Sequence, residues 1–213
     1  MRKVLLLLLA SAIGALCELF SETGKLNLLN VHNEHRSQLA LGQFSVRGEK
    51  KPAATAMRKI SWSLKLAHAA TKFAETCPKN HSVVMNQGES IFWHYSTNLN
   101  SPEEYANEAP KKWWEEFETN GWNSLTYSHA TQRFQIGHAV QMAWQKTFKV
   151  GCGYSKCSVA TPDQNIVVVC RYYKKGNIEG EPIYEVGETC SKCPEEYRKC
   201  PFGLCEKEGV ETE

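Results

Sequence analysis

The chain has 213 residues, with 25 Lys and Arg against 23 Asp and Glu, and 42% of the residues are hydrophobic. This length fits one main domain with a small appendage. A charge so close to balance lacks the basic excess of nucleic-acid-binding proteins, so we expect no nucleic-acid partner.

The N-terminal residues have the pattern of a secretory signal peptide. Arg2 and Lys3 form a basic start, the apolar run Val4–Leu16 is too short to span a bilayer, and Ala15-Leu16-Cys17 supplies small residues for cleavage. We expect residues 1–17 to be removed, so that 23 basic residues balance 23 acidic ones. The mature protein is therefore expected to be secreted and extracellular, without a transmembrane segment.

Apolar residues at helical spacing predict four helices between residues 25 and 144. Ser61 is the expected cap of the second helix, and Pro110 is expected to break the third into two pieces. The predicted helices are Lys25–Ala40, Ser61–Cys77, Pro102–Phe117 and Thr131–Trp144.

Two strands are predicted in the second half of the chain, at Phe148–Tyr154 and Asn165–Tyr173. The second contains a continuous apolar run, Ile166–Val169, which is typical of a strand covered on both faces. We therefore expect helices on both sides of a small sheet.

The composition changes near Gly180, which predicts a main domain over residues 18–180 and a tail over residues 181–213. The tail is polar and too small to bury a core of its own, so disulfides must hold it. An even set of cysteines in an oxidising compartment predicts four disulfides, and this compartment makes a zinc site at Cys190-x-x-Cys193 the weaker alternative. The eight mature cysteines are Cys77, Cys152, Cys157, Cys170, Cys190, Cys193, Cys200 and Cys205.

Four stretches together resemble motifs of the CAP superfamily (cysteine-rich secretory proteins, antigen 5 and pathogenesis-related 1; SCP/TAPS). The resemblance covers roughly residues 26–180, and the cysteine-rich tail is most similar to the nematode venom allergen-like branch. The matching stretches are Gly137–Trp144 for the first signature, Val168–Asn177 for the second, His32–Arg36 for the N-terminal helix motif and Gly88–Trp93 for the Gly-Glu-Asn-type motif.

This resemblance implies an α+β fold, a three-layer αβα sandwich with a small disulfide-held C-terminal extension. It also implies two disulfides in the main domain, Cys77–Cys152 and Cys157–Cys170. For the tail we expect Cys190–Cys200 and Cys193–Cys205, although spacing alone does not give connectivity.

The family gathers two His and two Glu in a central cleft, and the matching motifs place these residues at His81, Glu89, Glu116 and His138. Glu115 is a rival for the third position. Such a tetrad suits zinc or magnesium, although no cofactor is required, and its alternative role is a hydrogen-bonded network that shapes the cleft. With the mature cysteines paired and no Gly-x-Ser-x-Gly motif, we expect no catalytic nucleophile and no enzyme activity.

The resemblance also implies lipid binding, of sterols and of fatty acids such as palmitate. Phe117, Trp122 and Tyr127 are five residues apart and resemble the family's sterol-binding loop, which we expect to act as a flexible aromatic lid. For fatty acids we expect a groove between the 66–77 helix and the 102–117 segment, lined by small residues such as Ala69, which equally allow close helix packing.

The sequence thus predicts a secreted venom allergen-like protein that binds lipids in or near a central cleft and modulates host immunity. One alternative is a metal-dependent hydrolase that uses the tetrad. Another is a protein ligand of a host receptor, with the tail and the basic loop Arg47–Lys51 as its contact surfaces. The sequon Asn80-His81-Ser82 predicts a glycoprotein, with its glycan beside the first cleft residue.

Overall fold

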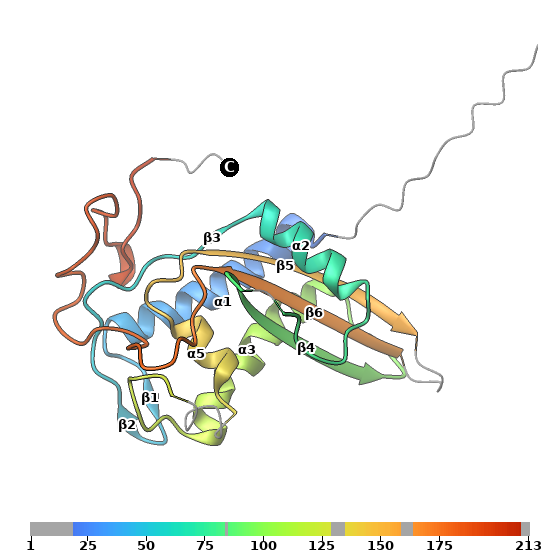
Figure 1. Cartoon of the computed structure of the whole chain (residues 1–213), viewed down its shortest axis with the longest axis horizontal. Coiled ribbons are helices and arrows are strands. Elements are labelled where there is room, and N and C mark those ends of the chain that lie inside the picture. The colour runs from blue at the N-terminus through green and yellow to red at the C-terminus, as the bar shows by residue number, and fades with distance from the viewer. Residues whose placement is uncertain (1–18, 84, 129–134, 159–163, 210–213) are drawn as a thin grey trace, which may run out of the picture.

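A computed structural model of the chain describes residues 19–83, 85–128, 135–158 and 164–209 (Figure 1). The predicted signal peptide lies outside these residues. Within them, no helix is both long and apolar enough to cross a membrane. The helices are α1 (Glu22–Ala40), α2 (Leu64–Ala74), α3 (Pro102–Asn120), α5 (Gly137–Ala143) and the short 3-10 helix η1 (Pro201–Gly203). The strands are β1 (Ser45–Val46), β2 (Glu49–Lys50), β3 (Ser61–Trp62), β4 (Gly88–Ser96), β5 (Lys149–Ser158) and β6 (Gln164–Tyr173).

The main sheet has four strands in the order β3-β5-β6-β4. The short β3 runs parallel to β5, and the other two pairs are antiparallel. β5 and β6 include the two predicted strands. The sequence did not predict β4, which pairs with β6 from Gly88 opposite Tyr172 to Ser96 opposite Gln164.

Helices cover both faces of this sheet, and the predicted three-layer αβα sandwich is confirmed (Figure 1). Successive side chains of a strand point to opposite faces. On β6, Val167 and Val169 therefore pack with α2, whereas Val168 and Cys170 belong to the larger core on the side of α1, α3 and α5. Burial on both faces explains why this strand reads as a continuous apolar run.

Helix α2 lies unusually close to the sheet, and two glycines of β5 make this approach feasible. A β-carbon on Gly151 would lie 2.2 Å from the amide nitrogen of Ala67, and one on Gly153 would lie 2.0 Å from the hydroxyl of Thr71. The small residues of α2 therefore serve close packing. The predicted fatty-acid groove between this helix and α3 was wrong, because the sheet lies between the two helices.

Helix α3 runs without interruption through Pro110, so the predicted break was wrong. Its start is fixed by a capping box, in which Ser101 and Glu104 each satisfy a backbone amide of the other. Its buried face includes Tyr105 before Pro110 and Trp113 after it, and both side chains pack into the main core. This packing outweighs the loss of one backbone hydrogen bond at the proline.

Two other helices are shorter than predicted. The cap of α2 is Ser63, whose hydroxyl accepts a hydrogen bond from the Leu66 amide, and the helix ends three residues before Cys77. Helix α5 begins at Gly137 rather than at residue 131. Residues 129–134 lie outside the described part of the chain, and Gln135 has a φ of 52°, which is not helical.

The disulfides of the main domain join Cys77 to Cys157 and Cys152 to Cys170, which corrects the expected pairing. Cys152 and Cys157 are an odd number of residues apart on β5, so they face opposite sides of the sheet. Cys152 lies directly opposite Cys170 on β6, with their Cα atoms 4.1 Å apart. Cys157 faces α2, and Cys77 follows that helix.

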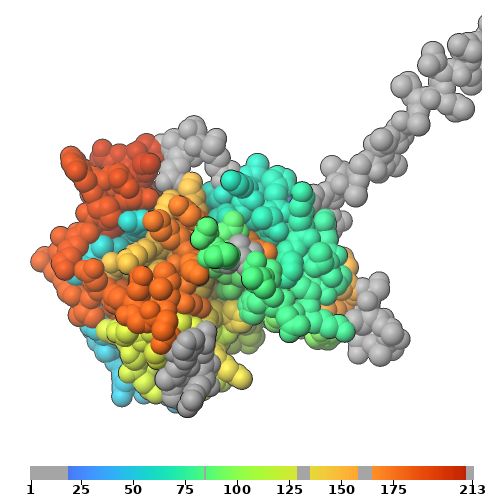
Figure 2. Space-filling model, viewed as in Figure 1, coloured from blue at the N-terminus to red at the C-terminus, as the bar shows by residue number. Residues whose placement is uncertain are grey.

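The described part of the tail, residues 181–209, is attached to the main domain, and Figure 2 shows its red part lying against the rest of the molecule. Its first part belongs to the main core, where Ile183 and Tyr184 are buried. Farther on, Cys205 exchanges backbone hydrogen bonds with residues 57 and 59. The tail disulfides are Cys190–Cys200 and Cys193–Cys205, the pairing expected from the sequence.

Candidate functional site

The carboxylate of Glu116, on α3, lies at the beginning of α5. Its Oε2 accepts hydrogen bonds from the backbone amides of His138 and Ala139, at 3.0 and 3.1 Å. Its Oε1 lies 2.6 Å from Nδ1 of the His138 ring. Residue 136 at the start of α5 offers no side-chain cap, so Glu116 supplies one from another helix while it orients the imidazole.

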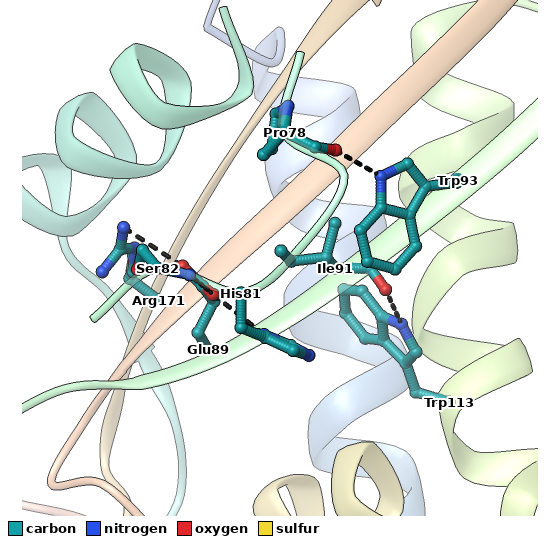
Figure 3. A network of polar contacts seen from close by, with 8 residues as sticks. All are labelled: Pro78, His81, Ser82, Glu89, Ile91, Trp93, Trp113 and Arg171. Atoms are coloured by element: carbon teal, nitrogen blue, oxygen red, sulfur yellow. Dashed lines mark hydrogen bonds and ion pairs between the residues drawn. The ribbon is translucent and has the colours of Figure 1, made fainter. Parts of the chain in front are cut away.

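A second carboxylate–histidine pair lies on the sheet side, where Glu89 of β4 meets the segment that follows α2 (Figure 3). Glu89 Oε1 lies 2.8 Å from Nδ1 of His81 and accepts a hydrogen bond from the Ser82 amide. The other oxygen accepts one from the Ser82 hydroxyl and lies 3.1 Å from the Arg171 guanidinium. Both carboxylate oxygens of Glu89 therefore have partners that fix their position, and the side chain is only 7% exposed.

These partners decide the protonation state of Glu89. Burial on its own raises the pKa of this carboxyl group, but the hydrogen bonds from His81 and Ser82 and the charge of Arg171 outweigh it. The net result is a pKa of Glu89 below its ordinary value. Glu89 is thus a carboxylate at neutral pH, suited to accept hydrogen bonds and to orient a ring rather than to donate a proton.

The two pairs face one another across a cleft of about 630 Å³, lined by all four tetrad residues. The ring centroids of His81 and His138 are 5.7 Å apart. Both rings use Nδ1 toward a carboxylate, which leaves Nε2 as the nitrogen that can bind a metal ion. Glu115 has a different role, because its side chain is exposed and bonded to Lys112.

Two tryptophans near His81 support this arrangement through hydrogen bonds to backbone carbonyls (Figure 3). The Trp93 indole donates a hydrogen bond to the carbonyl of Pro78 at 2.7 Å, which fixes the segment that carries His81. The Trp113 indole donates to the carbonyl of Ile91 on β4, which joins α3 to the sheet. Sequence reasoning did not assign these contacts, because they join segments that are distant in the chain.

The two signature stretches hold each other in place. Asn177 of the second signature donates a hydrogen bond to the carbonyl of Gly137 at 2.8 Å, and Gln141 accepts one from the Gly176 amide, also at 2.8 Å.

Arg171, which contacts Glu89, is also part of the second signature. Sequence reasoning did not assign Arg171 to the site. The signal that could have done so is its place one residue after Cys170, on the strand that pairs with the strand of Glu89.

The three residues predicted as a sterol-binding loop are buried, with exposed fractions of 0% for Phe117 and 2% each for Trp122 and Tyr127. The rings of Phe117 and Trp122 are stacked, with centroids 4.1 Å apart, and the Trp122 ring meets Tyr184 edge-on. The expected flexible lid was therefore wrong, because these aromatic rings fill the space between α3 and the start of the tail. Tyr127 also contributes to the wall of the tetrad cleft.

The basic loop predicted to contact a receptor is engaged within the protein. The Arg47 guanidinium donates hydrogen bonds to the carbonyls of Glu118 and Thr119, which are at the end of α3. Lys51 donates one to the carbonyl of Trp122 at 2.8 Å. These side chains close the end of a helix and hold the following loop, while Arg47 and Lys50 remain exposed.

The sequon residue Asn80 is exposed, next to His81 at the edge of the cleft. The Ser82 hydroxyl of the sequon is bonded to Glu89. A glycan on Asn80 would therefore stand at the rim of the cleft.

Comparison with known proteins gives one consistent result. The model of the cysteine-rich secretory protein family (CAP) matches residues 29–172. Venom allergen 5 of Tityus serrulatus is 30% identical over 88% of this chain and 45% of its own length. Venom allergen 3 of Solenopsis invicta is 32% identical over 78% of this chain and 74% of its own. The chain spans less than half the length of the first curated relatives it matches.

Solved structures agree with the sequence relatives. The crystal structure titled NaASP2 with Zn²⁺ is similar with a TM-score of 0.79 and 33% identity, over 87% of this chain and 96% of that one. The structure of Na-ASP-1 is similar with a TM-score of 0.80 and 29% identity, over 91% of this chain and 50% of that one.

Proposed function

Because the chain belongs to the cysteine-rich secretory protein (CAP) family, as a venom allergen-like member, we propose that it is a secreted protein that acts by binding rather than by catalysis. In this proposal the tetrad cleft holds a divalent metal ion, and the protein also carries a lipid. The observation that supports the metal site best is the pair of imidazoles that face one another, each with Nδ1 on a carboxylate.

The donor chemistry of the cleft fits zinc. A metal-binding histidine almost always donates its other ring N–H to a carboxylate, a backbone carbonyl or water, which fixes its tautomer and raises its basicity. His81 and His138 both have this arrangement, and imidazole nitrogens favour zinc over magnesium. The relative whose structure is titled with Zn²⁺ gives independent support for this choice.

The state of the carboxylates supports binding over catalysis. A general acid needs a raised pKa, and the pKa of Glu89 is lowered. Glu116 already accepts hydrogen bonds from two backbone amides and lies against the ring of His138. All eight mature cysteines are in disulfides, so none offers a thiolate nucleophile. A metal-dependent hydrolase remains the alternative that an activity assay must test.

The structure changes which lipid we propose that the protein carries. Burial of Phe117, Trp122 and Tyr127 removes the support for a sterol site at that loop. Carriage of a fatty acid keeps support from the family and from a second, partly apolar cavity of about 660 Å³. Modulation of host immunity, a glycan on Asn80 and engagement of a host protein belong to the same proposal, as properties of a secreted protein of this family.

Titration calorimetry with Zn²⁺ on the secreted, disulfide-intact protein tests the metal site. We expect saturable binding that His138→Ala weakens at least tenfold, because one of two imidazole ligands is lost. His68→Ala is the matched control, since His68 is exposed on α2 and does not line the tetrad cleft. Equal affinity in all three proteins would contradict the proposed site, and zinc-dependent ester or peptide hydrolysis that is lost in His138→Ala would favour the hydrolase.

A further inference from the structure

The sulfur atoms of the two tail disulfides lie close together, in the red part of the chain in Figure 1. Cys190 is paired with Cys200, and its Sγ lies within 4.8 Å of both Sγ atoms of the Cys193–Cys205 disulfide. Two disulfides this close can exchange partners without a large movement of the chain, once one of the four sulfur atoms is released as a thiolate.

The two tail disulfides differ in how easily a thiol from solvent can reach them. Cys200 is exposed and Cys190 is half-buried, whereas Cys205 is fully buried. The rate of thiol–disulfide exchange depends on access to the sulfur that is attacked, so we expect a small thiol to react first at Cys200. This attack releases the sulfur of Cys190, which is the one that lies close to the other disulfide.

The backbone around Cys190 also allows a different partner for this residue. Residues 190–193 form a turn, in which the Cys193 amide donates a hydrogen bond to the carbonyl of Cys190 at 3.4 Å. Such a turn brings its first and fourth Cα atoms to within about 7 Å of one another. Disulfides usually join Cα atoms about 4.4–6.8 Å apart, so a bond between Cys190 and Cys193 is within reach.

The other two cysteines of the tail are in a similar position. Lys199 and Glu206 exchange two backbone hydrogen bonds, at 3.3 and 2.8 Å, as an antiparallel pair. Cys200 and Cys205 are the next residues inside this pair. Facing Cα atoms at such a position in an antiparallel ladder are about 4.5 Å apart, which a disulfide can join.

We propose that the Cys190–Cys200 disulfide is a site of attack by a low-molecular-weight thiol, and that the attack converts the tail to the pairing Cys190–Cys193 and Cys200–Cys205. We call this the exchanged pairing. The inference is independent of the proposed metal and lipid binding.

The reaction has three steps. The thiolate of the small molecule forms a mixed disulfide with Cys200 and releases the thiolate of Cys190. Cys190 then attacks Cys193 and releases the thiolate of Cys205. Cys205 finally attacks the mixed disulfide at Cys200 and releases the small thiol. Three sulfur–sulfur bonds break and three form, so the thiol is a catalyst and no oxidant or reductant is consumed.

The exchange changes how the tail is closed. In the present pairing both disulfides join the 190–193 turn to the pair of Lys199 and Glu206, whereas in the exchanged pairing neither does. The Lys192 amide still donates to the carbonyl of Thr55, and the Cys205 amide to that of residue 57. Both ends therefore stay on the main domain, and the segment 194–198 between them loses its covalent closure.

A tryptic map without reduction, made after incubation of the whole secreted protein with a substoichiometric amount of glutathione, tests the inference. Trypsin cleaves after Lys192 and Lys199, so Cys190 and Cys193 fall in separate peptides and the other two tail cysteines fall together in peptide 200–207. In the present pairing these three peptides remain joined. In the exchanged pairing, peptide 200–207 is free and contains its own disulfide.

We expect the free peptide 200–207 to increase about tenfold or more over a sample without glutathione, when thiols are blocked with N-ethylmaleimide before digestion. The disulfide between Cys152 and Cys170 is the internal control, because both residues are fully buried and it should persist. An unchanged map would contradict the inference. So would reduced tail cysteines without the free disulfide-bonded peptide, or an equal reaction at the control disulfide.

The double variant Cys193→Ser and Cys205→Ser tests the second step. It keeps the site of attack but lacks the disulfide that Cys190 attacks next. With one equivalent of glutathione, we expect this variant to accumulate the mixed disulfide at Cys200, which the unaltered protein resolves. Equal accumulation in both proteins would show that the neighbouring disulfide takes no part in the reaction.

Discussion

One carboxylate of α3, that of Glu116, binds both the backbone amide and the ring Nδ1 of His138, at 3.0 and 2.6 Å. A single side chain thus caps the short helix α5 and sets the orientation and tautomer of the imidazole on it. The start of α5 and the geometry of the cleft are therefore coupled.

Glu116→Gln tests this coupling. The amide keeps the shape of the side chain but loses the charge, so the ring of His138 loses basicity and the start of α5 loses a favourable anion. We expect zinc affinity to fall by about 10–100-fold and the free energy of unfolding to fall by about 1 kcal/mol. Glu115→Gln is the control, because Glu115 is adjacent but exposed and bonded to Lys112. Equal zinc affinity in both variants would show that Glu116 does not orient a ligand.

The pairing of the main-domain disulfides can be checked by peptide mapping without reduction. Lys156 separates Cys152 from Cys157, so trypsin places these two cysteines in different peptides. We expect the peptide with Cys77 to be linked to the one that begins at Cys157. That peptide ends at Arg171 and also carries Cys170, so it should be linked to the Cys152 peptide as well. A species made of the Cys77 and Cys152 peptides alone would instead support the pairing expected from the family. Replacement of Cys77 and Cys157 by serine should cost about 4 kcal/mol, because this disulfide closes a loop of 80 residues.

These cysteines also show which features of the structure could be predicted from the sequence and which could not. The four residues that the resemblance names line one cleft, and each belongs to a short local motif. Helical spacing finds the four helices. The pairing failed because it depends on the register of β5 against β6, and the strand predicted from the sequence ended before Cys157. The prediction of a flexible aromatic lid failed for a different reason. Whether Trp122 is a lid or part of the core depends on Tyr184, which lies 62 positions later and whose packing no local pattern reveals.

A buried histidine predicts how stability depends on pH. His32 is fully buried, with Nδ1 donating to the carbonyl of Leu28 and Nε2 accepting from the Tyr172 hydroxyl. Burial, followed by the charge of Arg36, lowers the pKa of His32 to about 4 against an unfolded value of 6.5. The unfolded chain therefore binds a proton that the folded one does not as pH falls from 6.5 to 4, and stability is lost in that window.

Urea unfolding at pH 7 and pH 4 measures this effect. From the two pKa values, we expect His32 alone to remove about 3 kcal/mol of stability across the window. His32→Gln should lower stability at pH 7 but reduce the loss between the two pH values by about this amount. His68→Gln, at an exposed position of α2, should leave the loss unchanged. If His32→Gln and the unaltered protein lose the same stability, the buried ring does not cause the dependence.

The buried Arg36 of α1 holds the end of α5 to the rest of the fold. Its guanidinium donates hydrogen bonds to five backbone carbonyls, at distances from 2.6 to 3.3 Å. These carbonyls belong to Arg58, Met142, Trp144, Gln145 and Thr147.

Arg36→Lys keeps the charge but replaces a planar fork of donors with a single ammonium group. Several buried carbonyls then lose their partner, so we expect the free energy of unfolding to fall by about 3 kcal/mol or more. Because the end of α5 loosens, zinc affinity at His138 should fall as well, although Arg36 contacts no tetrad residue. Arg198→Lys, at an exposed position of the tail, is the control for both measurements. An unchanged unfolding midpoint in Arg36→Lys would mean that the carbonyls find other partners and that Arg36 does not position this helix.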